Sequence, residues 1–294
     1  MVPRAAPRPG TARLTGRLQV PGGGRLFLVH IARTFEEREE ARRLDNLALG
    51  PLRGATSQEV EEVARCGYVL LLRDMEGHLI GQSQVALGPT RRYPHLAPEE
   101  AFCVGTAVHP TFRGLGFGRI LARAQEMCAR HHRKERMVLL VRPENGRSIR
   151  MRLALGFQMV GYSPRALAHR EGERGGRLRM EKSLVEGVLP PPPWPLVRLV
   201  EAGAVRLVKD EEGLAHALAG GEPLALPILA GDDSPDAVDD PSARSLLVRL
   251  FGAPYVGIGL LRPEEHGFPF PAPGRNLLVF WPRERLREVT RSLP

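Results

Sequence analysis

Cysteine, lysine and long apolar runs are scarce in this chain of 294 residues, and each scarcity narrows what the protein can be. Cys66, Cys103 and Cys128 lie on apolar patterns, which favours buried free thiols over a disulfide or a metal set. None of the nine histidines forms a recognisable ligand pair, so we expect no metal site. No stretch approaches membrane-spanning length, and the Arg-, Pro- and Gly-rich N-terminus has no apolar secretory core. We therefore expect a cytoplasmic protein without a membrane segment.

The charge is unevenly placed. Residues 1–185 hold 31 Lys and Arg against 18 Asp and Glu, a net charge of +13, and residues 186–294 hold 11 against 15, a net charge of −4. A basic half favours an acidic partner, such as phosphate groups or nucleic acid. Because only three of the 42 basic residues are lysine, the excess is also typical of a GC-rich genome. We keep nucleic acid as a minor alternative, through the basic N-terminal arm.

The apolar content of 43% is enough for a real core, and the length favours two domains. Pro190–Pro193, followed by Trp194 and Pro195, predicts a stiff polyproline spacer. The predicted organisation is a basic flexible arm (1–24), a first domain (25–186), a proline-rich linker (187–197) and a second domain (198–294).

The most informative stretch runs from Val104 to Gly118. An apolar run ends at Val108, Pro110 blocks its continuation, and alternating glycines open an amphipathic segment. Glycines let backbone N–H groups approach a ligand, and helix-start amides favour anions, so a pyrophosphate cradle is predicted. The spacing does not fit a dinucleotide loop, whose last glycine would fall at Arg119, nor a P-loop, which needs a lysine.

The pattern that remains is Arg113-x-x-Gly116-x-Gly118, preceded by Val108-x-Pro110. It resembles the acetyl-CoA loop of the GNAT superfamily of N-acetyltransferases. The resemblance implies that loop amides hold the CoA pyrophosphate and that the preceding strand pairs with the pantetheine arm. The implied loop residues are Arg113, Gly114, Leu115, Gly116, Phe117, Gly118 and Arg119.

A second motif of the family follows at the expected separation. Its spacing is matched by Asn145, Ser148 and Gly156-Phe157. The position at which the family has a Tyr holds Arg152 in this chain. Upstream, Thr34-Phe35-Glu36-Glu37 and Thr56-Ser57-Gln58-Glu59 are capping boxes that open two helices, and a hairpin is expected around Gly77. We therefore predict an α/β (α+β) fold, with a GNAT-like mixed central sheet flanked by helices.

The second domain (198–294) is predicted to be a smaller α/β unit, and it contains no motif that we can assign. It could shape a substrate site, mediate assembly or be a degenerate acetyltransferase repeat, and a monomer or a homodimer is expected. The predicted strands are 205–208, 223–229, 255–261 and 276–281, and the predicted helices are 212–218, 242–251 and 283–291.

The chemistry implied by the resemblance is direct transfer of acetyl from acetyl-CoA, the co-substrate, to an amine. The backbone of Thr106, Ala107 and Val108 would pair with pantetheine, and the Val108 N–H would face the developing oxyanion. Asn145 would contact pantetheine or a bridging water, or else cap its helix. Arg152 cannot give up a proton at neutral pH but can stabilise the departing thiolate by charge.

Two further groups are candidates for proton transfer. Glu100 shares the strand parity of Thr106 and Val108 and could be the base, unless it lies in a solvated turn. Tyr162 could replace the missing Tyr as the acid, unless it only packs.

The segment between the last two strands carries Arg165, Arg170, Arg174 and Arg177, which favours an acidic acceptor. A non-catalytic acyl-CoA-binding protein remains the alternative to an enzyme.

Overall fold

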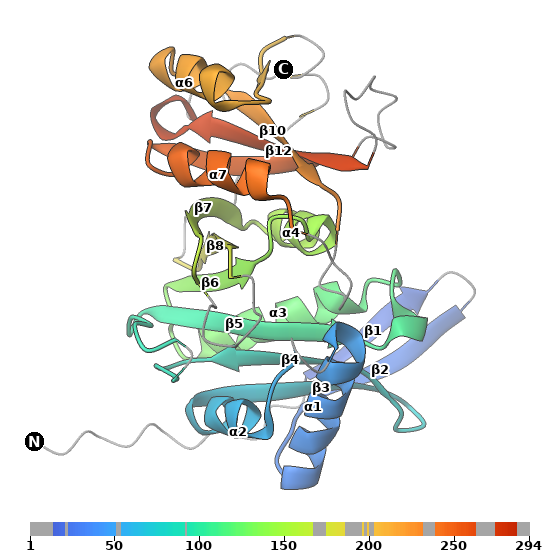
Figure 1. Ribbon diagram of the computed structural model, residues 1–294. Helices are drawn as coiled ribbons and strands as arrows, with labels where there is room; N and C mark the ends of the chain where they lie inside the picture. Colours follow the sequence, from blue (N-terminus) through green and yellow to red (C-terminus); the bar gives the residue numbers. More distant parts are fainter. Residues whose placement is uncertain are drawn as a thin grey trace, which may run out of the picture.

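In the computed structural model, a single sheet of twelve strands runs through the part of the chain that the structure describes (Figure 1). The strand order is β1-β2-β3-β4-β5-β6-β8-β7-β11-β12-β10-β9. The structure describes residues 14–20, 23–50, 54–91, 93–166, 175–185, 196, 199, 203–231, 239–262 and 274–286. Apart from Leu196, the predicted proline-rich linker lies outside this part of the chain.

The first half of the sheet has the predicted order of strands and helices, with one addition at its start. Residues 14–20, within the basic arm predicted for residues 1–24, form a strand that pairs with the next one. The strands are β1 (Leu14–Val20), β2 (Gly23–Ile31), β3 (Gly67–Asp74), β4 (Leu79–Ala86), β5 (Glu100–Val108), β6 (Arg136–Val141), β7 (Gln158–Ser163) and β8 (Arg177–Ser183). The helices are α1 (Phe35–Leu49), α2 (Ser57–Cys66), α3 (Phe117–His131) and α4 (Gly146–Leu153), with a 3-10 turn at Pro110–Phe112.

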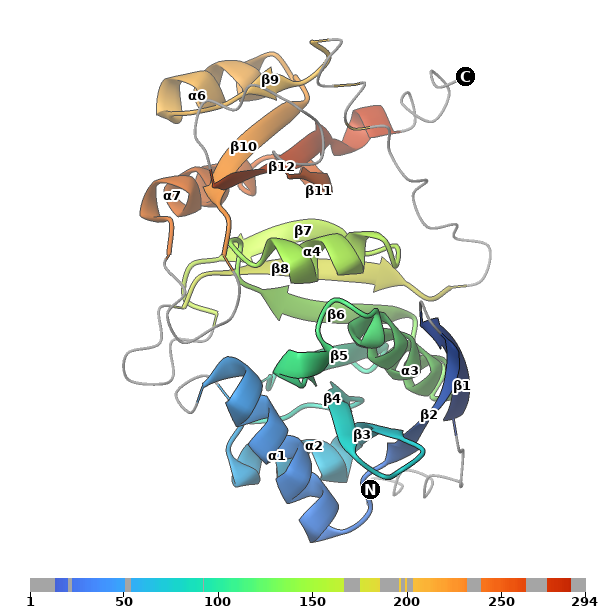
Figure 2. The ribbon, with the colours of Figure 1, turned by 90° about the vertical axis from the view of Figure 1, so that its right-hand side faces the viewer.

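Both predicted capping boxes are confirmed. The Thr34 and Thr56 side chains accept the backbone N–H groups of Glu37 and Glu59, whose carboxylates bond back to the cap backbone. Helices α1 and α2 pack on one face of the sheet through an apolar cluster that includes Val60. Helix α3 packs on the other face of β3, β4 and β5 (Figure 2). The central strands are therefore covered on both sides.

The second domain is α/β, as predicted, but it has no sheet of its own in the described residues. Its strand β11 continues the first sheet beside β7, where Gly257 pairs with Met159. Glycine is needed there, because a Cβ at position 257 would lie 2.7 Å from the Met159 Cβ. The elements are β9 (Arg206–Leu207), α6 (Glu211–Ala219), β10 (Leu224–Leu229), α7 (Pro241–Leu250), β11 (Tyr255–Leu261), β12 (Arg275–Pro282) and a 3-10 turn at Arg283–Arg285.

The part of the sheet from β5 to β9 is palindromic: the strand pairings on one side of the β7–β11 contact recur in reverse order on the other side. Strands β5 and β6 are parallel, and so are β9 and β10. The hairpin of β7 and β8 returns antiparallel beside β6, and the hairpin of β11 and β12 does the same beside β10. Helix α4 contacts β11, and α7 contacts β7 in return. The second half thus repeats the topology β5-α3-β6-α4-β7-β8, which favours the repeat among the three interpretations of this domain.

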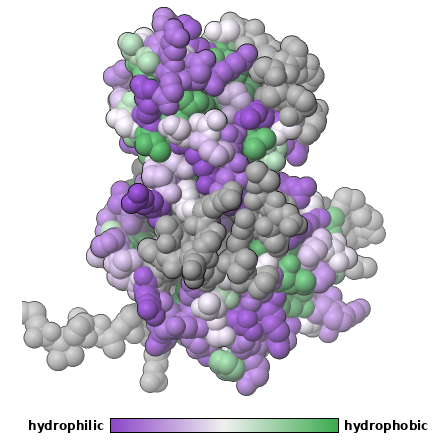
Figure 3. Space-filling view, in the orientation of Figure 1, coloured by the Kyte–Doolittle hydropathy of each residue, from purple (hydrophilic) through white to green (hydrophobic). Residues whose placement is uncertain are grey.

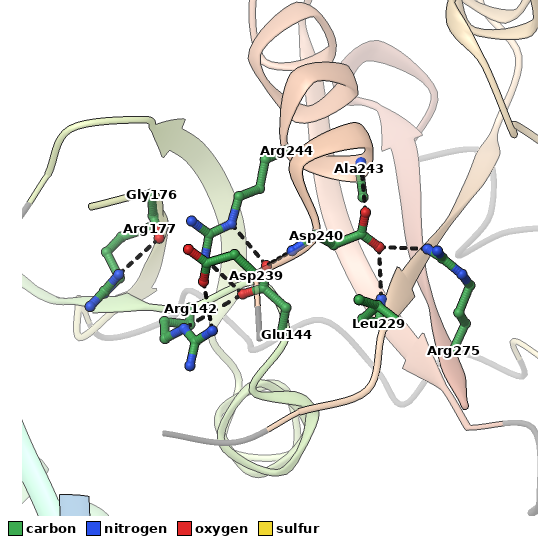
Figure 4. A network of polar contacts seen from close by, with 10 residues as sticks. All are labelled: Arg142, Glu144, Gly176, Arg177, Leu229, Asp239, Asp240, Ala243, Arg244 and Arg275. Atoms are coloured by element: carbon green, nitrogen blue, oxygen red, sulfur yellow. Dashed lines mark hydrogen bonds and ion pairs between the residues drawn. The ribbon is translucent and has the colours of Figure 1, made fainter. Parts of the chain in front are cut away.

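A buried ion network joins the two halves (Figure 4). Arg244 of α7 makes two bonds to the Glu144 carboxylate, at 2.8 and 2.9 Å, and a third to Asp239 at 2.7 Å. Arg142, at the end of β6, donates to Asp239 at 2.7 Å. Glu144 is fully buried. Burial disfavours the charged form of Arg244, but the hydrogen bonds and the charge of the Glu144 carboxylate outweigh burial and raise the pKa of Arg244.

Hydrophilic residues predominate on the face shown in Figure 3, and apolar ones are scattered. None of the described helices is long and apolar enough to cross a membrane.

Candidate active site

A cleft opens where β5 separates from β6. The two strands pair only from Glu100 to Phe102 on the β5 side, and the rest of β5 has no ladder to β6 in the described residues. The cleft has a volume of about 330 Å³ and is lined by residues 103–108 of β5, residues 139–141 of β6 and the α4 side chains Met151 and Arg152. A parallel pair that separates in this way leaves backbone groups available to an extended ligand.

The alternation of the strand decides which amides face the opening. The His109 N–H donates to the Ile80 carbonyl on the β4 side, so the N–H of Ala107 points the same way. The N–H groups of Thr106 and Val108 then lie on the opposite edge, toward the cleft. Of the three residues expected to pair with pantetheine, two therefore offer their backbone to the cleft, and Ala107 is engaged with β4.

The glycine-rich loop forms one end of the site. Gly114 and Gly116 have φ angles of +83° and +86°, and a Cβ on either would meet no atom within 4 Å, so the backbone conformation and not space requires glycine. Gly116 is the N-cap of α3 and offers no side chain to the helix amides. In the described part of the chain, no hydrogen bond uses the N–H groups of residues 114–118. A second hollow of about 460 Å³ lies over these amides, the arrangement that binds phosphate.

The side chains of the loop have different roles. Phe117 is buried in the main core and anchors the loop, whereas Leu115 and Arg119 are exposed. The Arg113 guanidinium donates to the Ala48 carbonyl at 3.0 Å. Arg113 therefore ties the loop to α1.

Arg152 lies inside the cleft with 4% of its surface exposed. Its guanidinium donates to the Gln125 Oε1 at 3.0 Å and the Thr106 Oγ1 at 3.3 Å, and it lies over the Phe157 ring. Among the described residues, no carboxylate lies within ion-pair distance of it. A buried cation without a carboxylate costs free energy that an anion in the cleft would offset.

Gln125 and Cys103 complete the surroundings of Arg152. Gln125 is fully buried and also donates to the carbonyls of Gln84 and Gly105. Sequence reasoning missed it, although a polar residue four positions after Leu121 on the apolar stripe of α3 was the available signal. Burial raises the pKa of the Cys103 thiol more than Arg152 lowers it, so the thiol stays protonated.

Asn145 lines the cleft, and its Oδ1 accepts the Ser148 N–H at 3.0 Å. The helix-capping role is thus present, and the contact with pantetheine stays a prediction.

Two predicted catalytic residues do not lie in the cleft. Glu100 is buried at the start of β5, where its carboxylate bonds to Arg179 at 2.9 Å and pairs with Arg136 at 3.5 Å. Tyr162 does not line the cleft either, and burial raises the pKa of its hydroxyl. The shared parity of Glu100 and Thr106 was a poor guide, because a β-bulge lies between them, at the register shift opposite Gln84 and Val85. Neither residue lies where it could act as an acid or a base in the cleft.

The arginines expected at the acceptor side are only partly brought together. Arg177 is buried and lines the cleft, and Arg165 is exposed. Arg170 and Arg174 lie outside the described residues. The cleft also contains Asp45 and Gln84, which sequence reasoning missed.

Comparison with known proteins identifies the family of the first part of the chain. Residues 31–157 match the model of the acetyltransferase (GNAT) family, so this part of the chain is a GNAT acetyltransferase domain. Its family uses acetyl-CoA.

The fold resembles that of solved structures over just over half of the chain. The yncA protein of Salmonella typhimurium, solved with its cofactor acetyl-CoA, is 20% identical and has a TM-score of 0.44, covering 57% of this chain and 99% of its own. Ard1 from Thermoplasma volcanium is 18% identical with a TM-score of 0.43, covering 54% and 99%. The ribosomal-protein-alanine N-acetyltransferase from Brucella melitensis is 21% identical with a TM-score of 0.43, covering 53% and 99%. No curated protein matches the sequence.

Proposed function

We propose that this protein transfers an acetyl group from acetyl-CoA to an amine by direct attack. The observation that carries the proposal is the separation of β5 from β6, which leads to an uncapped, glycine-lined helix start. Strand edge and helix start together match a ligand that has an amide-bearing arm and a pyrophosphate.

Each part then has a role in the reaction. The amides of residues 114–118 bind the pyrophosphate, and the backbone of Thr106 and Val108 pairs with pantetheine. The Val108 N–H faces the oxyanion, where one such donor is worth about 3–4 kcal/mol of barrier. The amine nitrogen bonds to the acetyl carbon, the carbon–sulfur bond breaks, and the amine's surplus proton leaves to solvent. Arg152 stabilises the thiolate by charge, so the missing Tyr does not stop the reaction.

Calorimetric titration with acetyl-CoA tests the cofactor site. Asp and Asn both tolerate a positive φ angle, so Gly116→Asp and Gly116→Asn differ mainly in charge. We expect Gly116→Asp to weaken binding by about a hundredfold and Gly116→Asn by much less, since a carboxylate would occupy the phosphate position. Gly77→Asp, at another open position with φ +91° in the β3–β4 turn, is the matched control and should bind as the wild type does.

Thiol release in the presence of a panel of amines tests turnover. Failure of the folded wild type to bind acetyl-CoA would overturn the proposal. Tight binding without thiol release from any amine would favour the non-catalytic acyl-CoA-binding alternative.

A further inference from the structure

Three buried polar side chains form a chain on the α1 side of the sheet, the face opposite α3. Asp45 of α1, Gln82 and Gln84 of β4 are 4%, 0% and 1% exposed. Asp45 and Gln84 line the cleft. The reaction proposed above uses none of these three side chains.

The hydrogen bonds fix the direction of this relay. The two Asp45 carboxylate oxygens accept the Ala55 N–H at 2.8 Å and the Gln82 Nε2 at 2.7 Å. Because a carboxylate accepts, Gln82 must turn its NH₂ group toward Asp45 and its Oε1 away. That Oε1 accepts the Gln84 Nε2 at 3.3 Å. The charge of Asp45 therefore orients the amide of Gln84 through two successive hydrogen bonds.

The end of the relay is an acceptor without a donor. The Gln84 Oε1 has no hydrogen-bond partner in the described part of the chain, although it is buried. A buried polar atom without a partner is rare, and it indicates a water or a ligand that supplies the missing group. Gln84 lies opposite Gly105 in the register of β4 and β5, so no side chain of β5 lies directly opposite it.

We propose that the Gln84 Oε1 receives an N–H of the acceptor amine, and that Asp45 and Gln82 are positioning residues that hold this oxygen toward the amine. The inference rests on the proposed function and adds the acceptor end of the same site. A carbonyl oxygen backed by a buried carboxylate selects an N–H donor with positive character, such as a primary amine. Arg152 lies on the α3 side of β5, where it bonds to Gln125 of α3. The amine would therefore meet the acceptor oxygen of Gln84 on one side of the sheet, and the thiolate would meet the cation of Arg152 on the other.

Two substitutions test the direction of the relay with n-butylamine as the probe and thiol release as the readout. Gln84→Met keeps the size and removes the oxygen. In Asp45→Asn, the new side chain keeps its oxygen on the Ala55 N–H and presents its NH₂ group to Gln82. The Gln82 amide then has to turn its oxygen toward position 45, and the Gln84 amide turns over in response. Gln84 therefore offers NH₂ to the amine in place of an oxygen. Each variant should lower kcat/KM for butylamine at least tenfold, through KM, and leave the Kd of acetyl-CoA unchanged.

The double variant separates positioning from mere packing. Asp45→Asn combined with Gln84→Met should be no worse than either single change, since the oxygen is already turned away or removed. Gln158→Met, on β7 and outside the cleft, is the control and should act as the wild type does. Butyltrimethylammonium, which has the charge but no N–H, should inhibit the wild type and Gln84→Met equally and weakly.

The outcomes distinguish this inference from the proposed function. No binding of acetyl-CoA by the wild type would overturn both. An unchanged KM for butylamine in folded Gln84→Met, or additive losses in the double variant, would overturn the relay alone. Turnover of other amines but not of butylamine would overturn it as well.

Discussion

The two halves of the palindromic sheet begin their first helices in opposite ways. Helix α3 starts at Gly116, which offers no side chain to the helix amides. Helix α6 starts at Asp210, whose carboxylate accepts the Gly213 N–H at 2.8 Å and is followed by Glu211 and Glu212. The first start attracts an anion, and the second is already neutralised by carboxylates. The same topology therefore favours an anion at the helix start in one half and disfavours it in the other, because of a few side chains.

The second helices of the two halves, α4 and α7, also differ in charge at one matching position. Seven positions after its N-cap, α4 has the buried Arg152 and α7 has Leu247, which is fully buried in the main core. A leucine stabilises its half by packing, whereas a guanidinium without a carboxylate costs free energy. The comparison indicates that the first half gives up stability at this position for a charge in the cleft.

Removing the contact between the halves should have the largest effect. Arg244→Met leaves the fully buried Glu144 without its bidentate partner, so we expect the free energy of unfolding to fall by about 3–5 kcal/mol. Urea unfolding measures it. Arg249→Met, on the same helix but in an exposed pair with Glu211, is the control and should cost less than about 1 kcal/mol. Equal losses in the two variants would contradict the importance of the network.

Making the first half resemble the second at position 152 should separate activity from stability. Arg152→Leu should lower kcat by about a hundredfold, the scale of losing one group that stabilises developing charge. Because a buried charge is removed, the urea midpoint should not fall. Arg150→Met, on the exposed side of α4, should change neither quantity. A normal kcat in Arg152→Leu would show that the thiolate leaves without this cation.

The smallest effect is expected at the start of α6. Asp210→Ala removes the N-cap bond to Gly213 and should destabilise the protein by about 1 kcal/mol, measured by urea unfolding. The affinity for acetyl-CoA should stay the same, because the phosphate loop lies in the other half. Asp210→Asn, which keeps a capping oxygen, should be nearly neutral. A weaker acetyl-CoA affinity in Asp210→Ala would mean that α6 contributes to the cofactor site.

Local signals were read correctly from the sequence. The capping boxes at Thr34 and Thr56, the glycine loop and the turn at Gly77 are where they were predicted, because each depends on residues within a few positions of one another. The register of the second motif placed Arg152 in the cleft for the same reason.

Long-range partners were not readable. Glu100 fits the strand parity, but its ion pair with Arg179 and the bulge in β5 depend on strands far away in the chain. The relay from Asp45 to Gln84 joins a helix to a strand 37 residues away and has no motif. The shared sheet was missed because the pairing of β11 with β7, where Gly257 lies opposite Met159, joins strands far apart in the chain and has no local signal.

The contact of β7 with β11 has a consequence for how the molecule assembles. Two separate chains that pair sheet edges must give up translational and rotational freedom, and their association depends on concentration. Here both edges belong to one chain, so the effective concentration of one for the other is set by the connection between them. The β7 edge, which would otherwise be open to a foreign strand, is occupied at any dilution.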